Sequence, residues 1–117
     1  MALMAVAFPI LPGKTEGWRG FIAELNGARH DDFAASRQNA GVHEVTFLQQ
    51  TPMGDLVLVT LEGDDPAGSF WKMSSGTDEF SKWFVAQVLA VHGVDISVPM
   101  PPPSEQVLDS KRAAVTA

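Results

Sequence analysis

Apolar residues recur at two different spacings in the N-terminal third of the chain, and each spacing predicts its own kind of element. Residues from about Leu3 to Leu11 form a nearly continuous apolar run, typical of a β-strand, which the Pro12–Gly13 pair ends. A helix is predicted to begin at Thr15, because large apolar residues then follow the i, i+3, i+4, i+7 spacing of one helix face. These residues are Trp18, Phe21, Ile22 and Leu25. A second helical piece, about Ala28 to Ala40, has a weaker pattern and ends at Gly41, a residue type common at helix C-termini.

Two more helices are predicted after the middle of the chain. The Asp65–Pro66 pair is a typical helix start, a capping carboxylate before a proline, and this short helix extends to about Met73. A longer helix begins at Thr77–Glu79, where two carboxylates favour the positive end of the helix dipole, and the His92–Gly93 pair closes it. Its apolar face consists of Phe80, Trp83, Phe84, Val88 and Val91.

Between these helices, the segments Val42–Thr51 and Asp55–Glu62 predict a β-hairpin. The connecting residues Thr51–Gly54 place proline second and glycine last, which favours a type I turn closed by a glycine bulge. That turn sets Thr51 opposite Asp55. One face then pairs Val45 with Leu61, Phe47 with Val59 and Gln49 with Val57. The other face pairs Leu48 with Leu58, Gln50 with Leu56, Thr46 with Thr60 and Glu44 with Glu62.

Both faces of this hairpin carry large apolar residues, although a sheet covered by helices on one side ordinarily has a polar second face. Leaving Leu48, Leu56 and Leu58 in water would forgo roughly 1.5–3 kcal/mol each. The chain has no further helices to cover them. We therefore expect a homodimer in which a second copy of the sheet packs on these three leucines.

The last predicted strand, Glu105–Leu108, follows a proline-rich connector over Pro99–Pro103. The order is then β-α-β-β-α-β, the split βαβ arrangement of ferredoxin-like α+β proteins, with an antiparallel four-stranded sheet. We expect one such domain over residues 1–110 and a flexible tail over residues 111–117.

Composition and charge exclude several classes of function. The chain has 117 residues, 45% of them apolar, which is enough for one core. Eight basic and 14 acidic residues give a net charge of −6, which disfavours nucleic acid or an anionic membrane surface as a partner. The absence of cysteine excludes disulfides and thiolate chemistry. Residues 1–12 lack the basic start of a signal peptide and the length of a membrane span, so we expect a cytoplasmic protein.

Few residues offer catalytic or metal-binding chemistry. His43 and Glu44 are adjacent on a predicted strand and point to opposite faces, so no metal site and no cofactor is expected. His92 is expected to cap a helix C-terminus, where the dipole favours positive charge. His30, in a polar helical segment, and His43 are the weak candidates for a general base. Glu44 and Glu62, paired at the open end of the hairpin, are expected to lie in solvent.

Four residues are candidates for contacting a small ligand. Trp71 lies in a short helix of small and polar residues, where an aromatic ring is free to wall a pocket between helix and sheet. Gln49 is the polar member of an otherwise apolar row, and a buried amide needs a partner such as a ligand or water. Phe47, in the same row, and Trp83, on the last helix, complete the set.

Three stretches resemble known proteins: LPGKTEGWRGFIAELNG, LQQTPMGDLVLVTLEGDDP and FSKWFVAQVLAVHGVD. With the element order, they resemble the dimeric α/β-barrel superfamily, and within it a family of short, uncharacterised bacterial proteins. The resemblance implies two ferredoxin-like sheets packed face to face, with the helices outside. The superfamily includes cofactor-independent monooxygenases of the antibiotic-biosynthesis type, lactone isomerases, haem-degrading enzymes and stress-response proteins. This chain departs from the haem-degrading members, because it has no tyrosine and its first strand has no asparagine.

Three hypotheses about function follow. The first is a homodimeric barrel that binds a small apolar or aromatic molecule between helices and sheet. The second is a cofactor-independent monooxygenase or isomerase acting in the same pocket, with His30 or His43 as the base. The third is a structural or stress-response dimer without a ligand. A cavity lined by both Trp71 and Gln49 favours the first, and exposure of both histidines to solvent removes the base of the second.

Overall fold

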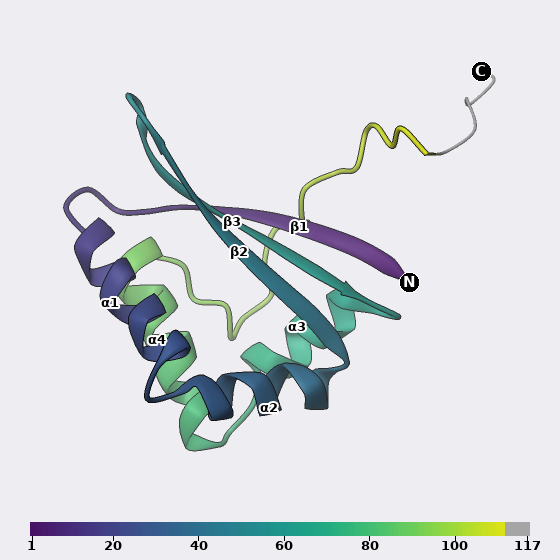
Figure 1. Ribbon diagram of the computed structural model, residues 1–117, viewed down its shortest axis with the longest axis horizontal. Coiled ribbons are helices and arrows are strands. Elements are labelled where there is room, and N and C mark those ends of the chain that lie inside the picture. Colours follow the sequence, from purple (N-terminus) through teal and green to yellow (C-terminus); the bar gives the residue numbers. More distant parts are fainter. Residues whose placement is uncertain (112–117) are drawn as a thin grey trace.

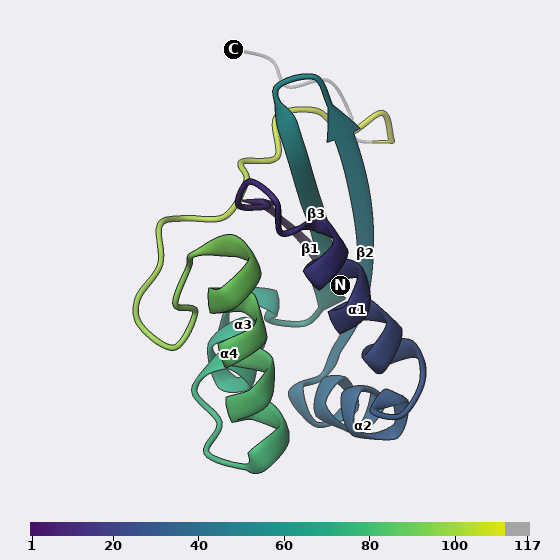
Figure 2. The same ribbon diagram turned by 90° about the vertical axis from the view of Figure 1, so that its left-hand side faces the viewer.

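The computed structural model describes residues 1–111 and contains one antiparallel sheet with four helices on one side of it (Figure 1). The strands are β1 (Ala2–Pro9), β2 (Val42–Thr51) and β3 (Gly54–Gly63), in the sheet order β1-β3-β2. The helices are α1 (Thr15–Asn26), α2 (His30–Ala40), α3 (Pro66–Ser74) and α4 (Glu79–His92). Figure 2 shows the helical layer and the sheet from the side. This arrangement confirms the predicted ferredoxin-like α+β order as far as the last helix.

The fourth strand predicted over Glu105–Leu108 is wrong, because the sheet of the described residues has three strands. An extended segment passes the free edge of β1 in its place, and Ser104 N donates to Ala5 O at 2.9 Å. The preceding prolines, Pro101–Pro103, have no N–H groups with which to extend this contact into a ladder. Residues 112–117, most of the predicted tail, lie outside the described residues.

The hairpin register differs by one residue from the prediction. Thr51 pairs with Gly54 rather than Asp55, so that Pro52 and Met53 alone form the turn. The Thr51 side chain closes this turn: its hydroxyl donates to Gly54 O at 2.6 Å and accepts from the Met53 N–H at 3.2 Å. Because side chains alternate between the faces of a sheet, a shift of one residue changes which β2 and β3 residues share a face.

The shifted register places Leu48 on the helix-covered face, opposite Val57. The prediction that Leu48 shares an open face with Leu56 and Leu58 is therefore wrong, whereas those two leucines do lie on the face without helices. That open face remains largely apolar. Its apolar residues are Leu3, Ala5 and Ala7 of β1, Val45 and Phe47 of β2, and Leu56 and Leu58 of β3.

The hydrophobic core lies between the sheet and the helices. The apolar faces predicted for α1 and α4 are buried there, with Trp18, Phe21, Leu25, Phe80, Val88 and Val91 in the cluster. Helix α4 begins as predicted, since the Asp78 carboxylate accepts from the Ser81 hydroxyl at 2.7 Å and from Ser81 N at 3.1 Å. These two hydrogen bonds, chiefly the one from the hydroxyl, lower the pKa of Asp78. The helix ends at Gly93, whose φ of 70° lies in the left-handed region. None of the described helices is long and apolar enough to cross a membrane.

Candidate ligand-binding site

A partly enclosed cavity of about 50 Å³ lies between the helix-covered face of the sheet and the helices. Most of its wall is aromatic or aliphatic. These residues are Phe8, Trp18, Phe21, Ile22, Leu25, Val57, Val59, Leu61, Phe70, Met73, Phe84, Val88 and Ile96. The polar wall residues are Arg37, Glu44, Thr46, Ser74 and His92. An apolar interior with a few polar groups is the usual composition of a small-molecule site.

Arg37 and Glu44 form a buried ion pair in the wall of this cavity. Arg37 Nε donates to Glu44 Oε1 at 2.7 Å, and the two side chains are 7% and 8% exposed. The Thr46 hydroxyl donates to Glu44 Oε2 at 3.2 Å, and Arg37 Nη1 donates to Ser36 Oγ at 2.9 Å. An ion pair in so dry a place needs these additional hydrogen bonds to offset the loss of water.

A short connection between helix and strand brings the pair together. Gly41 ends α2 with a φ of 75°, in the left-handed region, and the chain then enters β2 directly. Arg37 in the last turn of α2 therefore meets Glu44 near the start of β2. The rings of Phe33 and Phe84 lie 4.7 and 4.6 Å from the guanidinium carbon, within the range of a cation–π contact.

The expectation that Glu44 faces Glu62 in solvent is wrong for Glu44. Glu44 lies opposite Leu61 on the covered face, whereas Glu62 lies opposite His43 on the open face and is exposed. The register of the hairpin is the reason, because it separates the two glutamates onto different faces of the sheet. Glu44 then contacts Arg37 of α2 instead of Glu62.

His92 lies at the other end of the cavity. Its Nδ1 is 2.8 Å from Pro9 O, and because a carbonyl can only accept, Nδ1 carries the proton. Burial lowers the pKa of His92 below its ordinary value, so the ring is neutral at neutral pH and Nε2 is a hydrogen-bond acceptor. The expected role as a charged helix cap is therefore wrong: the side chain joins α4 to the end of β1.

Glu44 and His92 are too far apart to act together on one chemical group. The ring centroid of Phe8 lies 5.3 Å from that of His92, and Phe8 pairs with Val57 of β3. Glu44 pairs with Leu61, four residues further along the same strand. At about 3.3 Å per residue, the two polar ends are separated by about 13 Å along the sheet. The cavity thus has two polar ends and an apolar middle.

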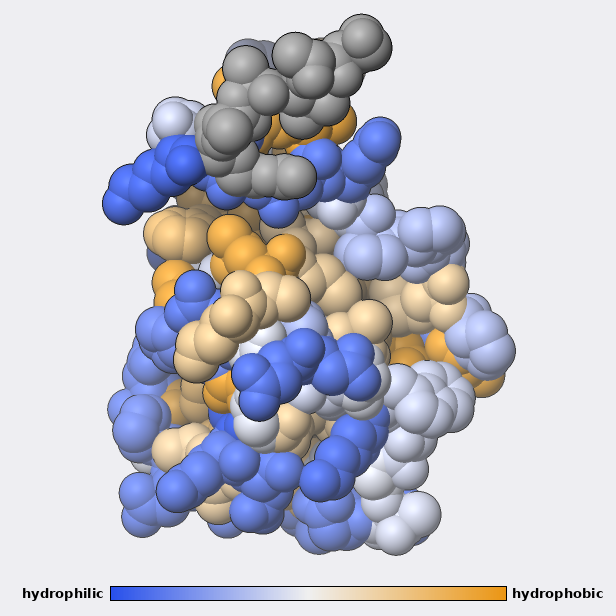
Figure 3. Space-filling model, turned by 90° about the vertical axis from the view of Figure 1, so that its right-hand side faces the viewer, coloured by the Kyte–Doolittle hydropathy of each residue, from blue (hydrophilic) through white to orange (hydrophobic). Residues whose placement is uncertain are grey.

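An open groove of about 210 Å³ adjoins the cavity between α3, β1 and the proline-rich segment. Trp71 forms part of its wall and is 49% exposed. Phe70 and Ile96 line both the groove and the cavity and so separate them. The other lining residues are Met4, Val6, Ala67, Val98, Met100 and Pro101–Pro103. Figure 3 shows that hydrophobic residues gather on this side of the molecule, between the hydrophilic helical layer and the C-terminal segment.

The structure does not bring the predicted ligand residues Trp71 and Gln49 together. Trp71 lines the groove beside the cavity, but Gln49 lies exposed on the open face, opposite Leu56. Phe47 is also on the open face and is 53% exposed. Because the hairpin register differs from the predicted one, Phe47 and Gln49 lie on the open face and not beside the cavity.

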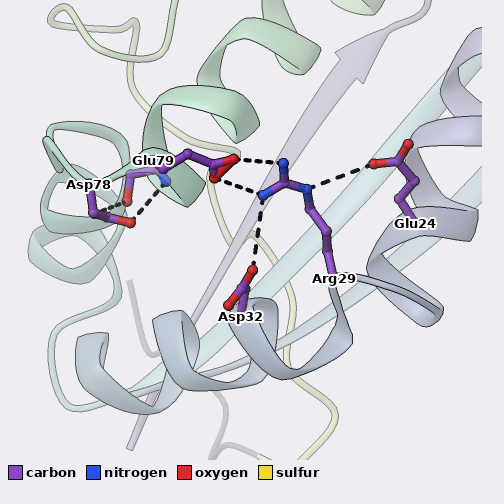
Figure 4. A network of polar contacts seen from close by, with 6 residues as sticks. Glu24, Arg29, Asp32, Asp78 and Glu79 are labelled. Carbon is purple, nitrogen blue, oxygen red and sulfur yellow. Dashed lines mark hydrogen bonds and ion pairs between the residues drawn. The ribbon is translucent and has the colours of Figure 1, made fainter.

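Trp83 lies at a corner where α1, α2 and α4 meet through Arg29. The Arg29 guanidinium carbon is 4.2 Å from the centre of the Trp83 ring, and its two Nη atoms donate to the Glu79 carboxylate at 2.9 and 2.7 Å. Glu24 and Asp32 lie 3.8 and 3.9 Å from the same guanidinium (Figure 4). The Arg29–Glu79 hydrogen bond raises the pKa of Arg29 and lowers that of Glu79. In the structure, Trp83 thus supports a junction of three helices.

His30 and His43, the predicted candidates for a base, both lie on the surface. His30 is the exposed first residue of α2, and His43 is exposed on the open face of the sheet. Neither belongs to the wall of the cavity. Within residues 1–111 no three His, Cys, Asp or Glu side chains cluster in a way that could hold a metal ion.

Sequence reasoning missed the polar residues of the cavity. The alternation of side chains along the strand shows that Glu44, Thr46 and Leu48 lie on the same face of the sheet. Whether that face is the helix-covered one depends on the register of the hairpin, which the turn sets. Arg37 had a local signal, since it is the one basic residue of α2 and lies one turn before the helix-ending Gly41. His92 gave no such signal, because its partner is a backbone carbonyl far away in the sequence.

Comparisons with known proteins show the fold. No protein-family model matches the chain, and no curated protein matches it. The structure is similar to the crystal structure of an L-rhamnose mutarotase from Formosa agariphila, with a TM-score of 0.60 over 95% of this chain and 100% of that chain. The sequence identity is 12%, so the likeness shows a ferredoxin-like α+β fold and does not show a shared activity. The finer resemblance to an uncharacterised bacterial family stays a prediction.

Proposed function

We propose that this protein binds a small, mainly apolar or aromatic molecule with one oxygen acceptor in the cavity between helices and sheet. The main observation is the Arg37–Glu44 pair, with Thr46, in the wall of an otherwise apolar cavity. Apolar residues of similar volume often stabilise a fold at least as well as a buried ion pair, so the pair in this wall favours recognition over support alone. A guanidinium has five N–H donors, of which the contacts to Glu44 and Ser36 use two. A carbonyl or hydroxyl oxygen of a ligand can accept hydrogen bonds from the remaining N–H groups.

The size of the cavity restricts the ligand. At about 50 Å³ it has room for a few water molecules, whereas a dry cavity that binds benzene measures about 150 Å³. The adjoining groove is larger, at about 210 Å³. Rotation of the Phe70 side chain, which lines both spaces, would join them. We therefore propose that the ligand's ring lies in the groove beside Trp71 and that its polar end reaches Arg37.

A second candidate is acid–base chemistry on the same ligand, as in a cofactor-independent monooxygenase or isomerase. The observation that favours it is His92, a neutral imidazole whose Nε2 is a hydrogen-bond acceptor in the cavity wall. This base differs from the predicted His30 and His43, which are exposed. The mutarotase fold makes a sugar hemiacetal one substrate to test, although an apolar wall suits a ring with fewer hydroxyls better.

The binding proposal is tested by a thermal-shift and NMR screen against small aromatic acids, phenols and ketones. Thr46→Val removes one hydroxyl from the polar end of the cavity, and Thr60→Val makes the same change on the opposite face of the sheet. The Thr46 hydroxyl donates to Glu44 Oε2, and its loss leaves that oxygen to compete with the ligand for the N–H groups of Arg37. We therefore expect Thr46→Val to weaken a hit about tenfold and Thr60→Val to leave it unchanged. Equal effects of the two variants would contradict a ligand in this cavity.

Acid–base chemistry needs its own measurement. Anomer exchange of L-rhamnose, followed by saturation-transfer NMR, tests mutarotation, and product analysis with each screening hit tests isomerisation and oxygenation. We expect His92→Gln to abolish turnover while Thr60→Val retains it. Turnover that survives His92→Gln would remove the assignment of the base, and a screen without any hit would favour the structural or stress-response dimer.

We also propose a homodimer formed through the open face of the sheet. The evidence is the exposed apolar surface on that face, including Leu3 at 58% and Phe47 at 53% exposure, beside Leu56 and Leu58. Isolated apolar side chains are common on surfaces, but a continuous apolar face of a sheet is typical of an interface. The one charged row of this face contains Leu3, Glu62 and His43 and lies at its end.

Sedimentation velocity at micromolar concentration tests the dimer. We expect Leu58→Lys to produce a monomer, because the lysine would lie at the centre of the interface. Met53→Lys makes a comparable change at the tip of the hairpin, where Met53 is 98% exposed, and is expected to leave the dimer intact. A wild-type monomer at these concentrations would contradict the proposal.

A further inference from the structure

The C-terminal part of the described chain is an extended segment that packs on little of its own protomer. After Ser104, which bonds to Ala5 of β1, residues 105–109 belong to no helix or strand. Two large apolar side chains in this segment, Val107 and Leu108, are 82% and 86% exposed. In Figure 1 the segment leaves β1 on the side of the sheet opposite the helices, which is the open face.

Two neighbouring apolar side chains of an extended segment are both buried only when other surfaces pack on the two opposite sides of that segment. Successive side chains of an extended segment point in opposite directions, so Val107 and Leu108 cannot both be covered by one surface. The protomer itself offers one sheet on this side. A second copy packed on the open face supplies the second surface.

The distances agree with this placement. Packed sheets lie about 10 Å apart, and an extended chain advances about 3.3 Å per residue. From its contact with β1 at Ser104, the chain gains about 13 Å by Leu108, which is enough to reach a facing sheet.

We propose that residues 104–111 act as an arm that crosses to the partner in the homodimer, with Val107 and Leu108 packed between the two open sheet faces. The inference rests on the proposed dimer and adds the element that completes its interface. The uncharged rows of the open face around Ala5, Ala7 and Leu58 fit the two apolar side chains. The charges of the arm, Glu105, Asp109 and Lys111, then lie toward the rim.

The first experiment measures the dimer dissociation constant by sedimentation equilibrium. We expect the double variant Val107→Ser/Leu108→Ser to raise the dissociation constant at least about tenfold, because two apolar contacts are lost from the interface. Met53→Ser, at an exposed methionine outside the arm, is expected to have no effect. Circular dichroism should show unchanged folding of all three proteins, since these side chains are exposed within the chain. An unchanged constant for the double variant would overturn the proposal.

The second experiment locates the arm. The chain has no cysteine, so Asp109→Cys carries a single nitroxide label, and the labelled protein is mixed with unlabelled, ¹⁵N-enriched protein. We expect intermolecular broadening of the amide signals of Ala5, Ala7 and Leu58 in the ¹⁵N partner. A dimer without such broadening would overturn the arm and leave the dimer standing. A monomer at every concentration would overturn both, while the ligand test with Thr46→Val remains independent.

Discussion

The two faces of the sheet both contain apolar residues, but they differ in what else they contain and in what covers them. The helix-covered face holds a carboxylate, Glu44, at 8% exposure, and satisfies it with Arg37 and Thr46. The open face holds Phe47 and Leu3, which are more than half exposed. A charge is buried on one side, and large apolar residues are exposed on the other. The ligand site proposed above uses the first face, and the proposed homodimer interface uses the second.

The difference shows that polarity alone does not tell which face of a strand is buried. Glu44 points inward because the end of α2 places a guanidinium there, and the paired arrangement offsets the loss of hydration. Phe47 points outward because it alternates with Thr46 and Leu48, which the same strand turns toward the helices. Each assignment depends on a neighbour from another part of the chain.

The largest expected effect comes from breaking the buried pair. Arg37→Met leaves Glu44 without its partner in the wall of the cavity, and we expect a loss of about 3–5 kcal/mol in the free energy of unfolding, measured in urea at pH 7. Arg37→Met/Glu44→Leu removes both charges and should recover most of that loss.

The matched control is Arg29→Met, at the corner where three helices meet. The carboxylate of its partner Glu79 is 71% exposed and remains hydrated without the arginine, so we expect a much smaller loss than for Arg37→Met. If Arg37→Met were no more harmful than Arg29→Met, the burial of a charge pair on the covered face would be contradicted.

A smaller effect tests the register directly. Leu48→Ala leaves a space on the covered face and should lower the free energy of unfolding by about 2 kcal/mol or more. Leu58→Ala, on the open face, should cost less than about 1 kcal/mol when measured on the monomer, and should act on dimerisation instead. Equal losses would favour the register predicted from the turn, in which these leucines face each other.

The smallest effect is a pH dependence from His92. Its pKa in the folded protein lies below the ordinary value of 6.5, so the unfolded chain binds a proton that the folded chain does not. The free energy of unfolding should therefore fall as the pH is lowered from 6.5 through the folded pKa. Urea unfolding at pH 7.5 and 5.5 measures it, and His92→Gln should show a smaller difference between these two pH values. An identical difference in the variant would contradict a buried, neutral His92.

Local patterns were sufficient to predict most elements. The apolar face of α1 and the capping carboxylates of α3 and α4 lie in the segments where spacing predicted them, because such signals depend on residues within one or two turns. The fourth strand failed because a β-strand needs a backbone partner, and the chain leaves the edge of β1 after the hydrogen bond from Ser104 to Ala5.

The site was less predictable than the fold. Trp71 does line a groove between helix and sheet, as its unusual surroundings indicated, although contact with a ligand remains a prediction. Gln49 was assigned to the cavity through a predicted register that differs by one residue from the observed one, in which Thr51 pairs with Gly54. Arg37 and His92 depend on contacts with a strand carbonyl or carboxylate that no local pattern contains.

The sequence by itself determined the order of the elements up to α4, the acidic charge, the lack of thiol chemistry and the presence of more apolar strand surface than the helices can cover. These properties follow from composition and from spacing between near neighbours. Only the tertiary structure decided that Glu44 is buried, that Leu48 belongs to the core and that the C-terminal segment lies free beside β1. Those outcomes depend on the register of the hairpin and on partners from distant parts of the chain, because a shift of one residue moves every side chain of a strand to the other face.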